Sequence, residues 1–294
     1  GMSPVPPEVV ARLPRWSDVV SQYGPTPILR GLESCARFRS SVPRRDRYAA
    51  VSGLFNTGTN LLGKLMTQNC QIDGRVRGTG MRSQVPWGKH NPPSTHRLKN
   101  VAQLGGVGVN QTAVFPMVLI KDPYHWAVSQ CRHKYQFTWE HDDEHCPNIV
   151  DWRTGQPTKL RVKFAIPPKV EYATFVGLWN EWHAEYEAQS SVFPLAFLRF
   201  EDILFHAEEV VSKLCRCVGG RRRNGGKFIY PEESAKKNLS GHAGSNGLVE
   251  ALARYGDPGK RLEGWTREDL EYAREELDEG LMDRYGYSRP DWAS

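Results

Sequence analysis

Long apolar runs are missing from this 294-residue sequence. No window approaches the roughly 18 uninterrupted apolar residues that a membrane-spanning helix requires. The opening residues also lack the basic and apolar regions of a signal peptide. We therefore expect no membrane span and a cytoplasmic location, while an anchor or a signal upstream of residue 1 stays open.

Basic runs interleaved with aromatic residues are also missing, so the sequence offers no groove for nucleic acid. The formal net charge of +6 suits an anionic ligand, but many enzymes without such a ligand carry a similar excess of Lys and Arg. We expect no nucleic-acid partner, and nothing in the sequence predicts the oligomeric state.

Cysteine is sparse, and its six residues are spread without a dense framework: Cys35, Cys70, Cys131, Cys146, Cys215 and Cys217. This distribution favours free thiols in a reducing compartment. Cys215 and Cys217 are separated by one residue, which is the wrong spacing for a zinc knuckle, and no matching second pair exists. We expect free thiols and no bound metal.

The composition is typical of a globular protein, with 39% hydrophobic and 24% charged residues. The length permits one large α/β domain or two small domains. We favour a single domain at residues 46–294. Residues 1–45 are rich in Pro, Arg and Ser, and we interpret them as an N-terminal arm packed on that domain.

Strand-like and helix-like segments alternate along the chain. Three apolar runs are typical of buried parallel strands, at residues 48–55, 113–120 and 194–200. Helical patterns follow at residues 60–69, 170–190, 201–220 and 266–286, and a further helix begins at Pro123 with Asp122 as its N-cap. The polar stretches 71–112 and 137–168 are interpreted as loops, and the second as an irregular insert over the active site. The alternation predicts an α/β fold, a parallel sheet with helices on both faces.

The segment "GLFNTGTN" (53–60) lies between the first strand and its helix, where phosphate-binding loops lie. Gly53 and Gly58 have the spacing of a P-loop. A nucleoside-triphosphatase loop continues with a Lys for the phosphates and a hydroxyl for Mg²⁺, but this chain continues with Thr59 and Asn60. The loop therefore predicts a phosphate site that lacks both groups.

Three separated segments, "LFNTGTNLL", "KDPYHWAVS" and "LRFEDIL", follow the three strands, and "LMDRYGY" lies near the end of the chain. Together they resemble the sulfotransferases that use 3′-phosphoadenosine-5′-phosphosulfate (PAPS) as donor, over roughly residues 48 to 287. The resemblance implies the P-loop-like fold of that family. It implies a 5′-phosphate site at Asn56, Thr57, Gly58, Thr59 and Asn60, and a 3′-phosphate site at Lys121 and Ser129, with Arg221 of a basic loop as a further contact.

The resemblance also implies a catalytic group. Family members commonly place a Lys immediately before the loop core, where this chain has Asn56. "WGKHNPP" resembles the Lys-x-His-x-Pro segment that carries the family's catalytic His, so we expect His90 to act as general base, with Lys89 or Lys64 stabilising the leaving group. Glu201 or an acid at 140–145 stays open as an alternative base. Trp87 and Trp126 are candidates for contacts with adenine, or simply core residues.

The expected reaction is an in-line, metal-independent transfer of a sulfuryl group to the hydroxyl of a small molecule or a carbohydrate. A transferred sulfuryl group carries less negative charge than a terminal phosphoryl group, so a metal is less necessary. Two other functions stay open. One is a P-loop kinase-like nucleotide enzyme with an altered loop, and the other is a donor-binding module without turnover.

Overall fold

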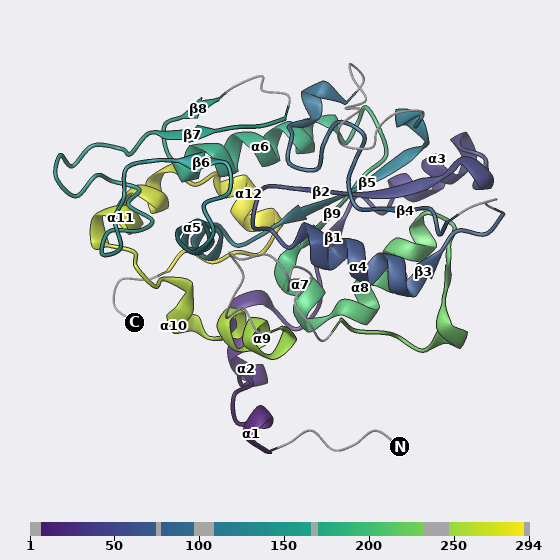
Figure 1. Cartoon of the computed structure of the whole chain (residues 1–294), viewed down its shortest axis with the longest axis horizontal. Coiled ribbons are helices and arrows are strands. Elements are labelled where there is room, and N and C mark those ends of the chain that lie inside the picture. The colour runs from purple at the N-terminus through teal and green to yellow at the C-terminus, as the bar shows by residue number, and fades with distance from the viewer. Residues whose placement is uncertain (1–6, 75–77, 97–108, 166–169, 232–246, 291–294) are drawn as a thin grey trace.

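A mostly parallel sheet forms the centre of the computed structural model, which describes residues 7–74, 78–96, 109–165, 170–231 and 247–290 (Figure 1). Its order is β1-β9-β5-β2-β4. The strands are β1 (Leu29–Arg30), β2 (Tyr48–Gly53), β4 (Met81–Arg82), β5 (Val114–Ile120) and β9 (Ala196–Arg199). β1 comes from the N-terminal arm and pairs antiparallel with β9, whereas the other neighbours are parallel. The three predicted strands are thus confirmed as adjacent members of one sheet.

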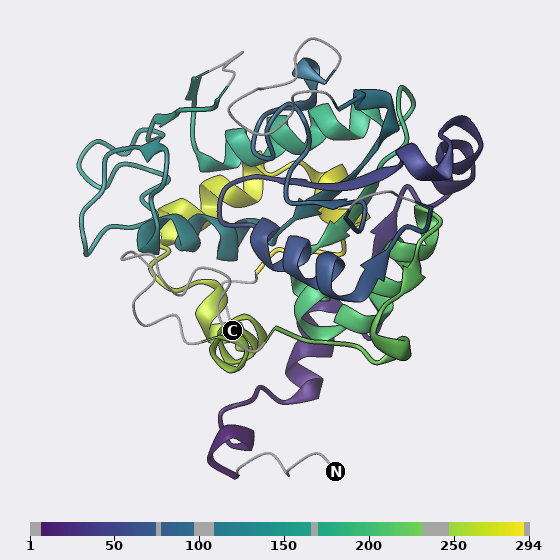
Figure 2. The same ribbon diagram turned by 45° about the vertical axis from the view of Figure 1, so that its right-hand side comes forward.

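Helices form the largest regular part of the remaining described chain. They are α1 (Pro7–Val10), α2 (Trp16–Tyr23), α3 (Ser34–Ser41), α4 (Thr59–Asn69), α5 (Pro123–Arg132), α6 (Phe175–Gln189), α7 (Phe200–Phe205), α8 (Ala207–Cys217), α9 (Leu248–Gly256), α10 (Pro258–Arg261), α11 (Arg267–Glu276) and α12 (Glu279–Arg284). In Figure 1 and Figure 2, α1 lies apart from the sheet, near the N-terminus. Within the described ranges, no helix is long and apolar enough to cross a membrane.

Two hydrophobic cores cover the two faces of the sheet. Side chains alternate along β5, so that Val118 and Ile120 enter one core while Met117 and Leu119 enter the other. The first core includes residues of α5, α6, α11 and α12, and the second includes residues of α3, α4, α7 and α8. The aromatic stripe of α6 is buried in the first core, which explains its three- and four-residue spacing.

Two predicted helices are each divided in the structure, so the expectation of single helices is wrong. His206 has φ −132° and ψ 30°, which separates α7 from α8. Leu277 is extended, with φ −65° and ψ 129°, and Asp278 then caps α12. The predicted cap at Thr266 is confirmed, because its side chain and that of Asp269 form a capping box.

The insert at 137–168 is more regular than expected. It contributes β6 (Phe137–Thr138) and β7 (Leu160–Val162) to a small antiparallel sheet. The third strand of that sheet, β8 (Glu171–Tyr172), follows the insert. Ala165 N donates to Asn91 Oδ1 at 3.2 Å, so the end of the insert lies beside the loop that carries His90. A separate pair joins β3 (Cys70–Gln71) to β10 (Arg221–Arg222).

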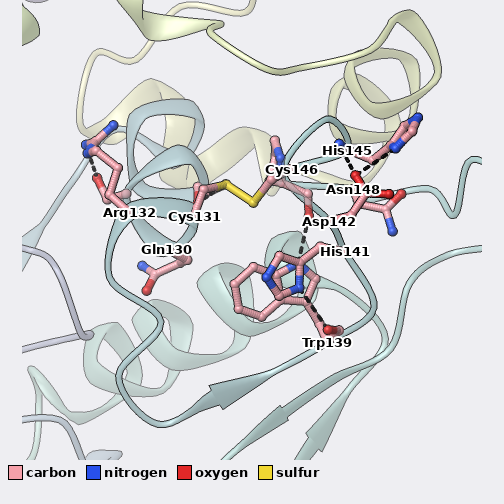
Figure 3. Close-up of a disulfide and its surroundings, with 12 residues drawn as sticks. Gln130, Cys131, Arg132, Trp139, His141, Asp142, His145, Cys146 and Asn148 are labelled. Carbon is pink, nitrogen blue, oxygen red and sulfur yellow. Dashed lines mark hydrogen bonds and ion pairs between the residues drawn. A yellow bond between two sulfur atoms is a disulfide. The ribbon is translucent and has the colours of Figure 1, made fainter. Parts of the chain in front are cut away.

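All six cysteines are paired, so the expectation of free thiols is wrong. The disulfides are Cys35–Cys217, Cys70–Cys215 and Cys131–Cys146. The first two fasten α8 to α3 and to the end of α4. The third ties the end of α5 to the insert (Figure 3). Two of the pairs join residues 182 and 145 positions apart, a proximity that only the fold creates and that no local spacing reveals.

Candidate functional site

The loop between β2 and α4 has the geometry of a phosphate-binding turn. Gly58 has a left-handed φ of 80°, and a Cβ built on it would clash with the Phe200 ring, so only glycine fits there. α4 begins directly afterwards at Thr59, and the first N–H groups of a helix lack intrahelical acceptors. These N–H groups and the positive end of the helix dipole favour an anion at this turn.

The side chains of the loop mainly hold its shape. Thr57 is buried, and its hydroxyl donates to Leu54 O at 2.7 Å, while Thr59 is buried at the start of α4. Asn60 Oδ1 accepts from Lys89 Nζ at 2.7 Å. Backbone N–H groups are therefore the principal donors that this turn offers to a phosphate.

Asn56 fastens the loop to the end of α5. Its backbone is left-handed, with φ 62°, and its amide donates to Gln130 Oε1 at 2.8 Å, His133 O at 2.8 Å and Ser129 O at 3.2 Å. These contacts explain an Asn where the resemblance leads us to expect a Lys. Asn56 holds two parts of the site together and contributes no charge.

Lys121 and Ser129 meet as their eight-residue spacing predicts. Lys121 follows β5 and is 1% exposed, and its Nζ donates to Ser129 Oγ at 2.7 Å. The intervening turn is fixed by Asp122, whose side chain accepts from the N–H groups at the start of α5, as predicted for an N-cap. Lys121 Nζ also lies 3.3 Å from Asn56 O, so the two predicted phosphate sites are adjacent.

Two further residues join this group, and the sequence analysis missed both. Arg132 Nη2 donates to Ser129 Oγ at 3.2 Å. Tyr255 of α9 accepts from Lys121 Nζ at 2.8 Å, and its ring lies 4.3 Å from that nitrogen. Arg132 was detectable, because it lies one helical turn after Ser129. Tyr255 is 134 residues from Lys121 and carries no motif.

Burial and charge act together on this cluster. Burial lowers the pKa of Lys121 below its ordinary value, and the contact with Tyr255 partly opposes that shift. Burial alone raises the pKa of Tyr255, but the positive charges of Lys121 and Arg132 outweigh it and lower the pKa to about 8. The cluster is thus an electropositive site that favours a negative charge.

His90 lies beside the loop between β2 and α4, where a ring nitrogen meets a backbone carbonyl. Its Nδ1 is 2.7 Å from Gly53 O, and its ring stacks on Phe55 with centroids 4.0 Å apart. Because a carbonyl oxygen only accepts, Nδ1 carries a hydrogen in this contact, and the neutral tautomer that matches it has its lone pair on Nε2. Gly53 N donates to Lys89 O at 2.8 Å, which keeps the His90 segment against the end of β2.

The two predicted lysines lie along the start of α4. Lys89 is half-buried and fixed by its hydrogen bond to Asn60. Lys64 is half-buried one turn further along α4. Lys89 is therefore held at the loop, whereas Lys64 lies farther along the helix.

Arg221 is not brought to this group. It lies on β10, which pairs with β3 directly after the far end of α4, and its side chain binds Asp73 at 2.7 Å. The 11 residues of α4 separate the two ends by about 16 Å, since a helix rises about 1.5 Å per residue. The structure therefore places this expected 3′-phosphate contact at the wrong end of the helix.

Trp87 and Trp126 are core residues. Trp87 is fully buried and donates to Tyr186 OH at 3.1 Å. Trp126 is 1% exposed and donates to Phe55 O at 2.7 Å. Both rings pack inside the protein, and the indole of Trp126 holds the loop between β2 and α4 through the Phe55 carbonyl.

The alternative bases have structural partners. Glu201 is fully buried; its carboxylate accepts from Asp122 N at 3.1 Å and from Tyr287 OH at 2.9 Å. Burial, with a smaller effect of Asp122, raises the pKa of Glu201 to about 7. Within the 140–145 loop, Asp142 binds His145 at 2.9 Å near the third disulfide (Figure 3). Both carboxylates are thus engaged in contacts within the protein, and Glu201 lies beside the start of α5.

Glu201 predicts a pH dependence of stability. Its folded pKa of about 7 exceeds its ordinary value of 4.5, so the folded protein retains a proton that the unfolded chain releases as pH rises. The free energy of unfolding should therefore decrease as the pH rises from 4.5 to about 7. Glu201→Gln should remove this decrease and raise the free energy of unfolding at pH 8 by up to about 3 kcal/mol, with little effect at pH 4.5.

Urea unfolding at pH 4.5 and pH 8 measures this effect, and Glu271→Gln on the exposed face of α11 is the control. An equal pH dependence of Glu201→Gln and the wild-type protein would show that Glu201 does not titrate in this range.

In comparisons with known proteins, the chain matches no family model and no curated protein. Its function is therefore inferred from the chemistry of the site, since a fold alone does not fix a function.

Proposed function

We propose that this protein is a sulfotransferase that moves a sulfuryl group from PAPS to a hydroxyl of a small molecule or a carbohydrate. One observation carries the proposal: Lys121 Nζ joins Ser129 Oγ at 2.7 Å and Asn56 O at 3.3 Å. These contacts unite two polar segments at the carboxyl ends of adjacent parallel strands, where α/β proteins bind nucleotides. One segment supplies N–H groups and a helix end, and the other supplies a buried cation.

The distribution of these groups suits a nucleotide with two separate phosphates. The turn at Thr57–Asn60 is proposed to bind the 5′-phosphate, and Lys121 with Ser129 the 3′-phosphate. The three ammonium hydrogens of Lys121 are matched by Ser129, Tyr255 and Asn56, so an anion that reaches Nζ has to replace one partner. Tyr255 is the partner that lies outside the two phosphate-binding segments.

The chemistry follows from the position of His90. The acceptor oxygen attacks sulfur in line with the departing 5′-phosphate, the bond between sulfur and the bridging oxygen breaks, and His90 Nε2 takes the acceptor's proton. Lys89, held by Asn60, supplies positive charge to the leaving group. In this proposal no step requires a metal.

A donor-binding module without turnover is the second candidate. Asn56 favours it, because this residue contributes no cation at the loop and its amide is fully engaged. His90 favours catalysis, because its ring is held at Gly53, at the start of the same loop. Transfer of labelled sulfuryl groups separates the two candidates.

The three disulfides support a compartment other than the cytoplasm. Structural disulfides form and persist in oxidising compartments and are rare in the cytosol. Cys35, Cys70 and their partners are nearly inaccessible to solvent, as expected of structural bonds rather than redox-active ones. We therefore propose that the protein functions in an oxidising compartment, in place of the cytoplasmic location expected from the sequence.

Thermal unfolding with nucleotides tests the proposed function. We expect 3′-phosphoadenosine 5′-phosphate to raise the melting temperature by several degrees, since a ligand at about 100 times its dissociation constant stabilises by about 2.7 kcal/mol. ATP with Mg²⁺ at the same concentration should have a smaller effect. A larger shift with ATP and Mg²⁺ would instead support a kinase-like enzyme.

A further inference from the structure

An exposed tyrosine packs on the same phenylalanine, Phe55, as the proposed base, and its backbone has a conformation that tyrosine rarely adopts. Tyr135 has φ 46°, in the left-handed region. The other described non-glycine residues with positive φ are Asn56, Asn148 and Asn224, and Asn is the residue that tolerates this region best after glycine. A bulky side chain that persists in such a turn points to a role for the side chain itself.

The turn that carries Tyr135 is held on both sides. His133 O accepts from the Asn56 amide at 2.8 Å, and Phe137 N donates to Lys134 O at 2.9 Å. The Cys131–Cys146 disulfide fastens the preceding helix end to the insert (Figure 3). The position of Tyr135 is thus determined by the phosphate loop and by β6.

Aromatic rings connect Tyr135 to His90. Phe55 stacks on His90 with centroids 4.0 Å apart, and on Tyr135 with centroids 6.1 Å apart. Phe164, from the end of the insert, lies 6.3 Å from the same ring. The ring planes of His90, Tyr135 and Phe164 are each within 28° of the Phe55 ring plane. Phe55 and Phe164 are buried, whereas Tyr135 is 41% exposed, so Tyr135 is the member that presents a ring to solvent.

We propose that Tyr135 is a specificity-determining residue that stacks on the ring of the acceptor and directs a ring hydroxyl toward His90. This inference rests on the proposed function and names the acceptor class, a hydroxylated ring with at least one apolar face. An aromatic ring binds such a face by offset stacking or by C–H contacts. A pyranose sugar and a phenol share this chemistry, whereas an acyclic alcohol does not.

Saturation-transfer NMR titrations of the full chain test the proposal with three probes: cellobiose, 2-naphthol and glycerol. We expect the wild-type protein to bind at least one of the two ring probes and not glycerol. Tyr135→Gly should weaken binding of that ring about tenfold, while its melting temperature stays equal or rises, because glycine relieves the left-handed backbone. Tyr135→Phe should retain binding, and Trp16→Ala, which removes an exposed ring from α2, should have no effect.

The opposite signs for binding and stability distinguish a ligand contact from a structural one, which would lose stability together with binding. A response to cellobiose alone identifies a sugar acceptor, and a response to 2-naphthol alone identifies a phenol. Equal binding by the wild-type protein and Tyr135→Gly, or no binding of either ring by the wild-type protein, would overturn the inference. Sulfuryl transfer to the bound probe is measured separately: binding without transfer counts against the proposed function, while ring binding at Tyr135 still stands.

Discussion

Replacing His90 by Ala should lower kcat by about 10²–10⁴, the usual contribution of a general base. His90 Nδ1 contacts Gly53 O, so in the proposed reaction the acceptor's proton goes to Nε2, which alanine removes. The affinity for the donor should stay nearly unchanged, because none of the residues proposed to bind a phosphate forms a described hydrogen bond with the His90 ring. Initial rates with labelled PAPS and direct titration with 3′-phosphoadenosine 5′-phosphate measure the two quantities.

A matched control is His206→Ala, which removes a histidine between α7 and α8, and it should keep full activity. His90→Ala also removes a ring that stacks on Phe55, so its melting temperature must be compared with that of the wild-type protein. Near-full kcat in His90→Ala would place the base elsewhere. Loss of donor affinity at constant kcat would make His90 a residue that binds the nucleotide.

Replacing Lys121 by Met should weaken binding of 3′-phosphoadenosine 5′-phosphate by about 1.5–3 kcal/mol, the range for a hydrogen bond to a charged group. This corresponds to a factor of about 10 to 150 in the dissociation constant. Methionine preserves packing between the Phe200 and Tyr255 rings, which lie 4.7 Å and 4.3 Å from Lys121 Nζ, and removes the charge together with its hydrogen bonds. Alanine would leave a cavity at this buried position, so a loss of stability could not be separated from a loss of nucleotide affinity.

The control for this variant is Lys213→Met, which removes an ordinary surface cation of α8. Adenosine 5′-monophosphate lacks the 3′-phosphate, so its weaker binding should change little in Lys121→Met. An equal loss for both nucleotides would mean that Lys121 maintains the loop through Asn56 O rather than binding the 3′-phosphate.

Local patterns in the sequence were sufficient for the central strands and for part of the site. The apolar runs at 48–55 and 113–120 are short and bounded by turn residues, as is typical of buried parallel strands, and the two form adjacent strands. Asp122 followed by Pro123 fixes the start of α5, which in turn fixes the distance from Lys121 to Ser129. These features depend on neighbours within a few residues, and so they were predictable.

Features that depend on distant contacts were not predictable. Tyr255 contacts Lys121 from α9, and the Cys70–Cys215 disulfide joins two residues that are 145 positions apart in the sequence. Arg221 appeared suitable by charge, but β10 pairs with β3 and thereby places it beyond the far end of α4. Charge and residue type identify candidates, whereas the route of the chain decides which of them meet.

Calorimetric titration of the wild-type protein, with EDTA present, tests the central claim most directly. The two ligands are 3′-phosphoadenosine 5′-phosphate and adenosine 5′-monophosphate, which differ by the 3′-phosphate alone. If Lys121 and Ser129 bind that phosphate, the first ligand binds at least about tenfold more tightly without any divalent metal. Equal affinities, or binding that appears only when Mg²⁺ is restored, would contradict a PAPS site formed by these residues.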